Sequence, residues 1–399
     1  MKRNLIVVLS TVIALFLFQS CAHEDDPQPL PQNRYLTGVI TERHYTKADL
    51  IGVLNSFIPG MDFAATPVGA LICDVDIAAI TYTTTGVDGK KVEASGIVAM
   101  CSDTESYDNL LSVQHITLDQ EEAPSKMLFN LEIVPVFRKR IVVMADYLGY
   151  GVSETPTRQH PYLHIATTGT ACADMIEAAR EYLHDKGIRQ NSDQVELLGY
   201  SQGGTSTIAT LIELTKRGQS SLIASVHAGG GAYDLIGVLN RFIAEGNTLY
   251  SRSGYSPYLI RGMEYGEQLV LDQSKIYAPR LLNEGILKQL DVQPLSAWHE
   301  ILGQDLTQVI HPDFYAPNFN GNKDIHKLMA ALEKNSLITM DLPDVPITLY
   351  HSKMDDIIPY ANAEAAHAKW KGSKLVVLTS KGHVRAGVEF MLRYLGFFS

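Results

Sequence analysis

The chain has 399 residues, which is enough for one large domain with insertions or for two domains. Apolar residues make up 46% and charged residues 19% of the composition, which is typical of a globular protein. The formal net charge is −11 and no extended basic run follows the N-terminus, so the sequence argues against nucleic acid as a partner.

The first 20 residues have the pattern of an export signal. A basic start precedes an apolar stretch from Leu5 to Phe18, which is short for a membrane span. Cys21 and the acidic residues after it resemble the lipidated cysteine and sorting signal of surface-exposed bacterial lipoproteins. We expect a signal peptide at 1–20, an outer-membrane lipid anchor on Cys21 and a proline-rich tether at 21–34. The alternative is an ordinary secretory signal that leaves a periplasmic or secreted protein.

A β-hairpin is predicted near the start of the globular part, after a short amphipathic helix at 50–57. Residues 74–83 and 92–100 are strand-like, and Asp88-Gly89 between them is a turn signal. Cys73 and Cys101 flank the hairpin, and one bulge would bring them within reach of each other. In an oxidising compartment they would form a disulfide, and the alternative is two buried thiols. The chain has no Cys-x-x-Cys pair and no His-Glu-x-x-His motif, so we expect no metal site.

Shorter apolar runs follow and predict strands buried on both faces. The runs are 110–113, 141–145, 195–198, 222–226, 346–350 and 375–378. Helical patterns at 171–183 and 202–217 lie between them, so strands and helices alternate after the hairpin. This order predicts an α/β fold with a mostly parallel sheet of eight strands, whose site lies at the carboxyl ends of the strands.

Residues 228–340 interrupt this alternation. Their pattern is helical and irregular, and the segment is too long for a loop. We expect a helical cap over the carboxyl edge of the sheet, inserted into a core formed by residues 35–227 and 341–399. The alternative is a separate small domain with no part in the site.

Ser201 stands where the strand at 195–198 gives way to a helix. A nucleophilic serine on so sharp a turn needs small neighbours, and Gly199, Gly203 and Gly204 supply them. Such a serine also needs a histidine as its base and an acid that orients the histidine. On this turn geometry, the expected chain order is serine, acid, histidine.

The acid and the histidine are found in that order. Asp355 and Asp356 follow the next-to-last strand, and His383 follows the last strand. His351 is the alternative base, although it precedes the acid, and His383 could instead be a solvated loop residue. The sequence therefore predicts a triad of Ser201, His383 and one of the two aspartates.

Several segments together resemble the α/β-hydrolases, and among them the secretory lipase group. "GYSQGG" resembles the turn that carries the nucleophile, and "MADYLGYG" with "HPYL" resembles the group's Asp-Tyr-x-Gly-x-Gly and His-Pro-Tyr segments. "DDIIP" resembles the segment that carries the acid, which selects Asp355 over Asp356. The resemblance spans roughly residues 70–395 and implies that the helical insertion is a lid.

One segment departs from this pattern. Such enzymes often have His-Gly after the third strand, where a backbone N–H helps to bind the oxyanion. This chain has "VQHITLDQ" there, with Ile116 in the glycine position. We expect the backbone N–H of Gln202, together with that of Ile116 or Thr117, to form the oxyanion hole.

These observations predict an exported serine hydrolase that cleaves carboxylic esters through an acyl-enzyme and needs no cofactor. The substrate would be a small-molecule or glycan ester, and the sequence indicates neither its acyl chain nor the oligomeric state. One alternative is an aminopeptidase-like enzyme, for which Glu264 or Glu267 would bind a free peptide N-terminus. Another is a surface lipoprotein that binds a ligand without cleaving it, which the complete triad argues against.

Overall fold

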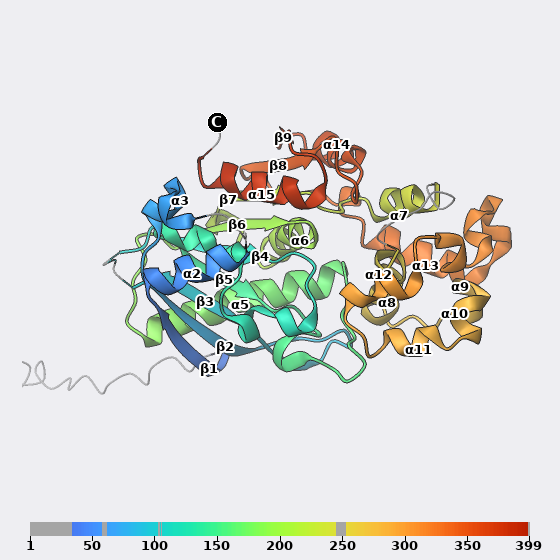
Figure 1. The fold of residues 1–399 in the computed structure, drawn as a ribbon, viewed down its shortest axis with the longest axis horizontal. Coiled ribbons are helices and arrows are strands. Elements are labelled where there is room, and N and C mark those ends of the chain that lie inside the picture. Colours follow the sequence, from blue (N-terminus) through green and yellow to red (C-terminus); the bar gives the residue numbers. More distant parts are fainter. Residues whose placement is uncertain (1–33, 58–61, 103, 105, 245–252, 398–399) are drawn as a thin grey trace, which may run out of the picture. The chain divides into compact units, whose positions relative to one another are not determined.

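The structure is a computed structural model that describes residues 34–57, 62–102, 104, 106–244 and 253–397 (Figure 1). Tyr35–Ser399 form one compact unit. The predicted signal peptide, Cys21 and the tether up to residue 33 lie outside the described residues. Within the described ranges, every helix is too short or too polar to cross a membrane.

A nine-stranded sheet forms the centre of the compact unit, in the order β1-β2-β3-β5-β4-β6-β7-β8-β9. The pairs from β1 to β5 are antiparallel, and all pairs from β5 to β9 are parallel. The strands are β1 (Leu36–Tyr45), β2 (Val75–Thr85), β3 (Lys91–Cys101), β4 (Leu110–Gln114), β5 (Ile141–Ala145), β6 (Val195–Tyr200), β7 (Ile223–Gly229), β8 (Ile347–Ser352) and β9 (Lys374–Leu378).

The predicted α/β fold with a mostly parallel sheet is confirmed, but the sheet has nine strands and not eight. The additional strand is β1, which pairs with β2 at the edge of the sheet. None of its residues is fully buried, so β1 lacks the apolar run that marks the other strands. The predicted hairpin corresponds to β2 and β3, which pair from Val75 opposite Cys101 to Thr85 opposite Lys91.

Helices cover both faces of the sheet, because each buried strand has apolar side chains on both sides. In β2, Ala78 and Ile80 pack into one cluster with α5 and α6, whereas Ile77 and Ala79 pack into another with α2 and α15. The helices of the core are α2 (Lys47–Phe57), α3 (Pro67–Leu71), α4 (Pro124–Met127), α5 (Ile165–Asp185), α6 (Gln202–Lys216), α14 (Tyr360–Lys369) and α15 (His383–Tyr394).

The segment between β7 and β8 is helical, and it is drawn mainly in yellow and orange in Figure 1. It has its own apolar cluster, which includes Leu239, Leu259 and Leu328 and reaches Ile357 and Ile358 in the loop after β8. The helices here are α7 (Leu235–Ala244), α8 (Tyr255–Gly266), α9 (Gln273–Ile276), α10 (Pro279–Asn283), α11 (Ile286–Leu290), α12 (Leu295–Leu302) and α13 (Lys323–Lys334). The cap thus packs on core loops that carry the predicted site.

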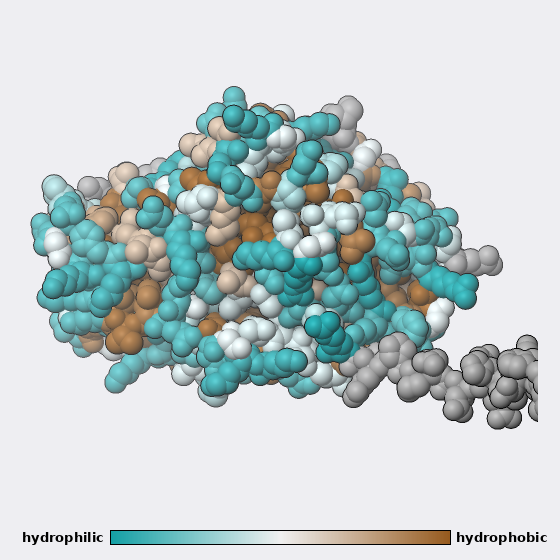
Figure 2. Space-filling view, turned by 180° about the vertical axis from the view of Figure 1, so that it is seen from behind, coloured by the Kyte–Doolittle hydropathy of each residue, from teal (hydrophilic) through white to brown (hydrophobic). Residues whose placement is uncertain are grey.

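A disulfide joins Cys73 and Cys101, whose Cα atoms are 5.8 Å apart. Cys73 lies just before β2 and Cys101 ends β3, so the bond closes the open end of the hairpin. Cys172 is a free cysteine buried in α5. On the face that Figure 2 shows, hydrophilic residues predominate and hydrophobic residues are confined to patches between them.

Candidate active site

Ser201 lies on the turn between β6 and α6. Its backbone has φ 60° and ψ −123°, a conformation that residues other than glycine rarely adopt. The N–H of Ser201 donates to the carbonyl of Gly229 in the neighbouring strand β7 at 2.9 Å. The sheet therefore holds the strained turn in place and presents the hydroxyl at the carboxyl end of β6.

The glycines around Ser201 are required by close packing. A Cβ atom on Gly199 would lie 2.3 Å from the carbonyl oxygen of Gly203, and one on Gly203 would lie 2.0 Å from that of Gln114. Real Cβ contacts do not come this close, so the start of α6 can approach β4 and β6 only where side chains are absent. The sequence pattern thus has a steric cause.

His383 is the first residue of α15 and contacts Ser201. Its Nε2 lies 2.7 Å from the Ser201 hydroxyl, although 182 positions separate the two residues in the chain. Its Nδ1 lies 2.7 Å from Oδ2 of Asp355, which follows β8. The structure thus places Ser201, His383 and Asp355 in one hydrogen-bonded chain of the kind that activates a serine.

Asp355 is held as a buried carboxylate. Its Oδ1 accepts the backbone N–H groups of Ile357 at 2.9 Å and Ile358 at 2.8 Å. Burial acts to raise the pKa of Asp355, but the hydrogen bond from His383 and the nearby imidazoles hold the pKa below its usual value. An ionised Asp355 keeps the proton of His383 on Nδ1, which leaves Nε2 free to accept the serine proton.

The two alternatives to this triad have other contacts. Oδ1 of Asp356 accepts the backbone N–H of His383 at 2.7 Å, at the start of α15, and does not contact the ring. His351 is buried, and its Nε2 lies 2.9 Å from the carbonyl oxygen of Ile358 and 3.4 Å from Oδ2 of Asp355. Burial lowers the pKa of His351. The hydrogen bonds of His351 therefore run to the acid loop and not to Ser201.

Comparisons with known proteins show which family and which folds this chain resembles. The secretory lipase family model matches residues 315–387, which include Asp355 and His383. A Legionella pneumophila protein described as a hydrolase has a similar structure, with a TM-score of 0.75, 24% identity, and coverage of 90% of this chain and 97% of its own.

Two further structures have the same architecture. For the rice cell wall degrading esterase LipA of Xanthomonas oryzae, the TM-score is 0.71 at 23% identity, over 92% of this chain and 96% of that one. For Candida antarctica lipase A in its closed state, the TM-score is 0.62 at 16% identity, over 90% of this chain and 80% of that one. The chain has the α/β-hydrolase fold. No match was found among curated proteins. The partial match to the secretory lipases, together with the fold, supports a hydrolase of the lipase or esterase type.

The residues predicted for the oxyanion hole lie around Ser201. Gln202 begins α6, and its side-chain Nε2 lies 2.8 Å from Nε2 of His160. Burial lowers the pKa of His160 to about 3, so the ring is neutral and accepts this hydrogen bond while its Nδ1 contacts the carbonyl of Leu148. Ile116 and Thr117 follow β4 and line the same cavity as Ser201.

One acidic residue of the site was not predicted from the sequence. Oε1 of Glu132 accepts the backbone N–H of Ile116 at 3.4 Å, and Glu132 lines the cavity that contains Ser201. A signal was present, because Glu132 is the single charged residue in the otherwise apolar run 131–137. The 3-10 helix that it belongs to, Leu131–Arg138, packs against the sheet.

The cavity in front of Ser201 is mainly apolar and has a volume of about 380 Å³. It extends between α2, the 3-10 helix at 131–138 and α15. Its apolar lining includes Leu54, Phe63, Val113, Leu131, Val388 and Met391. Such a lining is suited to the hydrocarbon part of a substrate.

The carboxylates expected for an aminopeptidase lie elsewhere. Glu264 lines a separate, more polar cavity of about 770 Å³ between the cap and the loop at 157–160. Glu267 binds Lys334 at 2.6 Å and the amide of Asn335 at 2.8 Å, so it joins α8 to the end of α13. Neither glutamate lines a cavity that includes Ser201.

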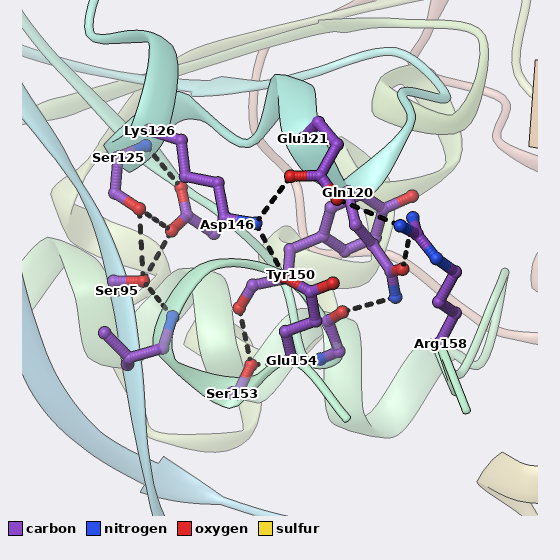
Figure 3. Close-up of polar contacts among 12 residues, drawn as sticks. Ser95, Gln120, Glu121, Ser125, Lys126, Asp146, Tyr150, Ser153, Glu154 and Arg158 are labelled. Carbon is purple, nitrogen blue, oxygen red and sulfur yellow. Dashed lines mark hydrogen bonds and ion pairs between the residues drawn. The ribbon is translucent and has the colours of Figure 1, made fainter. Parts of the chain in front are cut away.

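The "MADYLGYG" segment supports the site without lining its cavity (Figure 3). Asp146 is buried, and it accepts hydrogen bonds from the Ser95 hydroxyl at 2.5 Å, from the Ser125 N–H at 2.8 Å and from the Ser125 hydroxyl. Tyr150 donates to the carbonyl of Leu118 at 2.7 Å, and its hydroxyl lies 3.2 Å from that of Tyr258 in α8. The segment therefore fixes the loop after β4 and anchors the cap.

Proposed function

We propose that the chain is an exported hydrolase that cleaves carboxylic esters with Ser201, His383 and Asp355. The hydrogen-bonded chain from Asp355 through His383 to Ser201, with both contacts at 2.7 Å, carries this proposal. In the reaction, the Ser201 Oγ attacks the ester carbonyl while His383 Nε2 takes its proton. Asp355 keeps the ring oriented and stabilises the imidazolium that forms.

The remaining steps use the same groups. Backbone N–H groups of Gln202 and of Ile116 or Thr117 bind the oxyanion of the tetrahedral intermediate. The bond to the alcohol then breaks, and His383 gives the leaving oxygen its proton. Water, activated by His383, attacks the acyl-enzyme and releases the acid, so the cycle needs no cofactor.

An ester substrate fits the apolar cavity in front of Ser201. The Xanthomonas oryzae relative is an esterase that degrades rice cell walls, which makes a glycan ester a candidate beside small-molecule esters for this chain. For the location, we propose a lipid anchor on Cys21 in the outer membrane. Cys21→Ala should then release the protein from the membrane fraction and abolish incorporation of labelled palmitate, whereas membrane retention of the variant would contradict the anchor.

The test is hydrolysis of p-nitrophenyl esters from acetate to dodecanoate by a form that begins at Asp25, with Ser201→Ala beside it. The variant should fold normally and lose about six decades of turnover, or about 8 kcal/mol of transition-state stabilisation. A fluorophosphonate probe should label the wild type and not the variant. Labelling without ester turnover would favour peptide substrates, and absence of labelling would contradict the proposed triad.

A further inference from the structure

The Ser201 cavity contains one carboxylate that the proposed mechanism does not use. Glu132 lies in the first turn of the 3-10 helix at 131–138, and it is the sole acidic residue among the described residues that line this cavity. The residues around it are largely apolar, among them Leu131 and Val134. Glu132 is only partly buried, so water reaches its carboxylate in the open cavity. A substrate that fills this apolar space displaces that water, and the charged group then needs a polar partner.

Among the residues that the structure describes, no cation forms an ion pair with Glu132. Its one hydrogen bond to another residue is the long contact of 3.4 Å from the Ile116 N–H. Burial raises the pKa of Glu132, and the charge of Glu122 acts in the same direction. The pocket thus leaves part of the hydrogen-bonding capacity of this carboxylate for a ligand.

The position of Glu132 relates it to the reacting bond. Ile116, as the alternative to Thr117, supplies a backbone N–H group that we expect at the oxyanion, and Glu132 accepts from the Ile116 N–H. Because Glu132 accepts from this N–H and lines the same cavity as Ser201, we infer that the first two carbons beyond the carbonyl of a bound acyl group pass close to its carboxylate. For a plain acyl chain, the carboxylate competes for the N–H and repels the developing oxyanion. A donor on those carbons would engage the carboxylate and relieve both effects.

We propose that Glu132 is a specificity-determining residue, which favours esters whose acyl group carries a hydrogen-bond donor, either ammonium or hydroxyl, close to the carbonyl. The inference rests on the proposed ester hydrolysis. An aminopeptidase-like enzyme would need a carboxylate near Ser201. Glu132 supplies one there, whereas Glu264 and Glu267 do not line this cavity.

The experiment compares kcat/KM for methyl butanoate, methyl 3-hydroxybutanoate and methyl 3-aminobutanoate. Hydrolysis of each ester is measured as the release of its acid. The enzymes are the full chain, Glu132→Gln, Glu132→Leu and, as a matched control, Glu364→Gln, whose side chain is exposed on α14. The wild type should prefer at least one donor-bearing ester over methyl butanoate by on the order of tenfold, as expected for a hydrogen bond to a charged group. Comparing the hydroxy ester with the amino ester shows whether Glu132 favours a hydroxyl or an ammonium donor.

In Glu132→Gln the preference should shrink by a similar factor, while kcat/KM for methyl butanoate should rise, because the charge that repels the oxyanion is removed. Glu132→Leu should remove the preference, and Glu364→Gln should keep the wild-type ranking. An equal loss on all three esters in Glu132→Gln would show a structural role and overturn the inference. A wild type that shows no preference among the three esters would also overturn the inference, and this result does not depend on the folding of any variant. If the wild type hydrolyses none of these or the p-nitrophenyl esters, the proposed function itself fails.

Discussion

Replacing Asp355 by asparagine changes one polar group of a buried side chain, and the structure determines which one. Oδ1 accepts two backbone N–H groups, from Ile357 at 2.9 Å and Ile358 at 2.8 Å, so this position must stay an oxygen. The new amide nitrogen therefore takes the place of Oδ2, which lies 2.7 Å from His383 Nδ1. It donates to Nδ1 and forces the ring proton onto Nε2.

A ring protonated at Nε2 cannot accept the proton of Ser201. Loss of the correct tautomer is worth about 10⁴-fold in turnover, or about 5.5 kcal/mol of transition-state stabilisation. We therefore expect Asp355→Asn to lose about four decades of kcat/KM on p-nitrophenyl butanoate. Its fold should be retained, because both backbone hydrogen bonds of the loop remain.

Asp356→Asn is the matched control for this prediction. Asp356 is exposed and accepts only the backbone N–H of His383, which an asparagine oxygen can also accept. The expected loss is at most about 1 kcal/mol of stability, as for a helix cap, with activity within a few-fold of the wild type. Equal losses in the two variants, or a larger loss of kcat/KM in Asp356→Asn with an unchanged Tm, would refute the assignment of the acid.

Two further predictions concern stability. The disulfide of Cys73 and Cys101 spans 28 positions, so replacing both residues by serine should cost about 3–4 kcal/mol and keep the activity; an unchanged urea midpoint would contradict this. Burial acts to raise the pKa of Glu389, but hydrogen bonds from Ser380 and Thr379 hold it at about 2, below the ordinary 4.5. This stabilisation is complete above pH 4.5 and is lost as the pH falls through 2. Glu389→Gln should therefore lower the free energy of unfolding by about 2 kcal/mol at pH 7 and by little at pH 2, and equal losses at both would contradict the linkage.

Much of the fold could be predicted because buried strands and sharp turns impose local rules on residue type. Strands covered on both faces need apolar runs, and the turn at Ser201 needs glycines where a Cβ would meet a carbonyl oxygen. The edge strand β1 escaped prediction, because a strand without a buried face follows no such rule.

The choice between Asp355 and Asp356 as the acid of the triad does not follow from such local rules. Asp355 and Asp356 have the same chemistry and adjacent positions, so the residues alone left both open until a family resemblance selected Asp355. The loop after β8 turns one carboxylate to the His383 ring and the other to the backbone of α15. That difference depends on how the loop packs and on the two N–H groups that hold Asp355.

The sequence by itself thus determined the fold class, the nucleophile with its small neighbours and the chain order of the triad, because local sterics and strand burial govern these features. Tertiary structure alone decided which carboxylate lies in the Ser201 cavity. Glu132 is there through the packing of the helix at 131–138 against the sheet, whereas Glu264 and Glu267 are directed elsewhere by the cap. The residues that line a cavity are distant in the chain, so no local sequence pattern predicts that they come together.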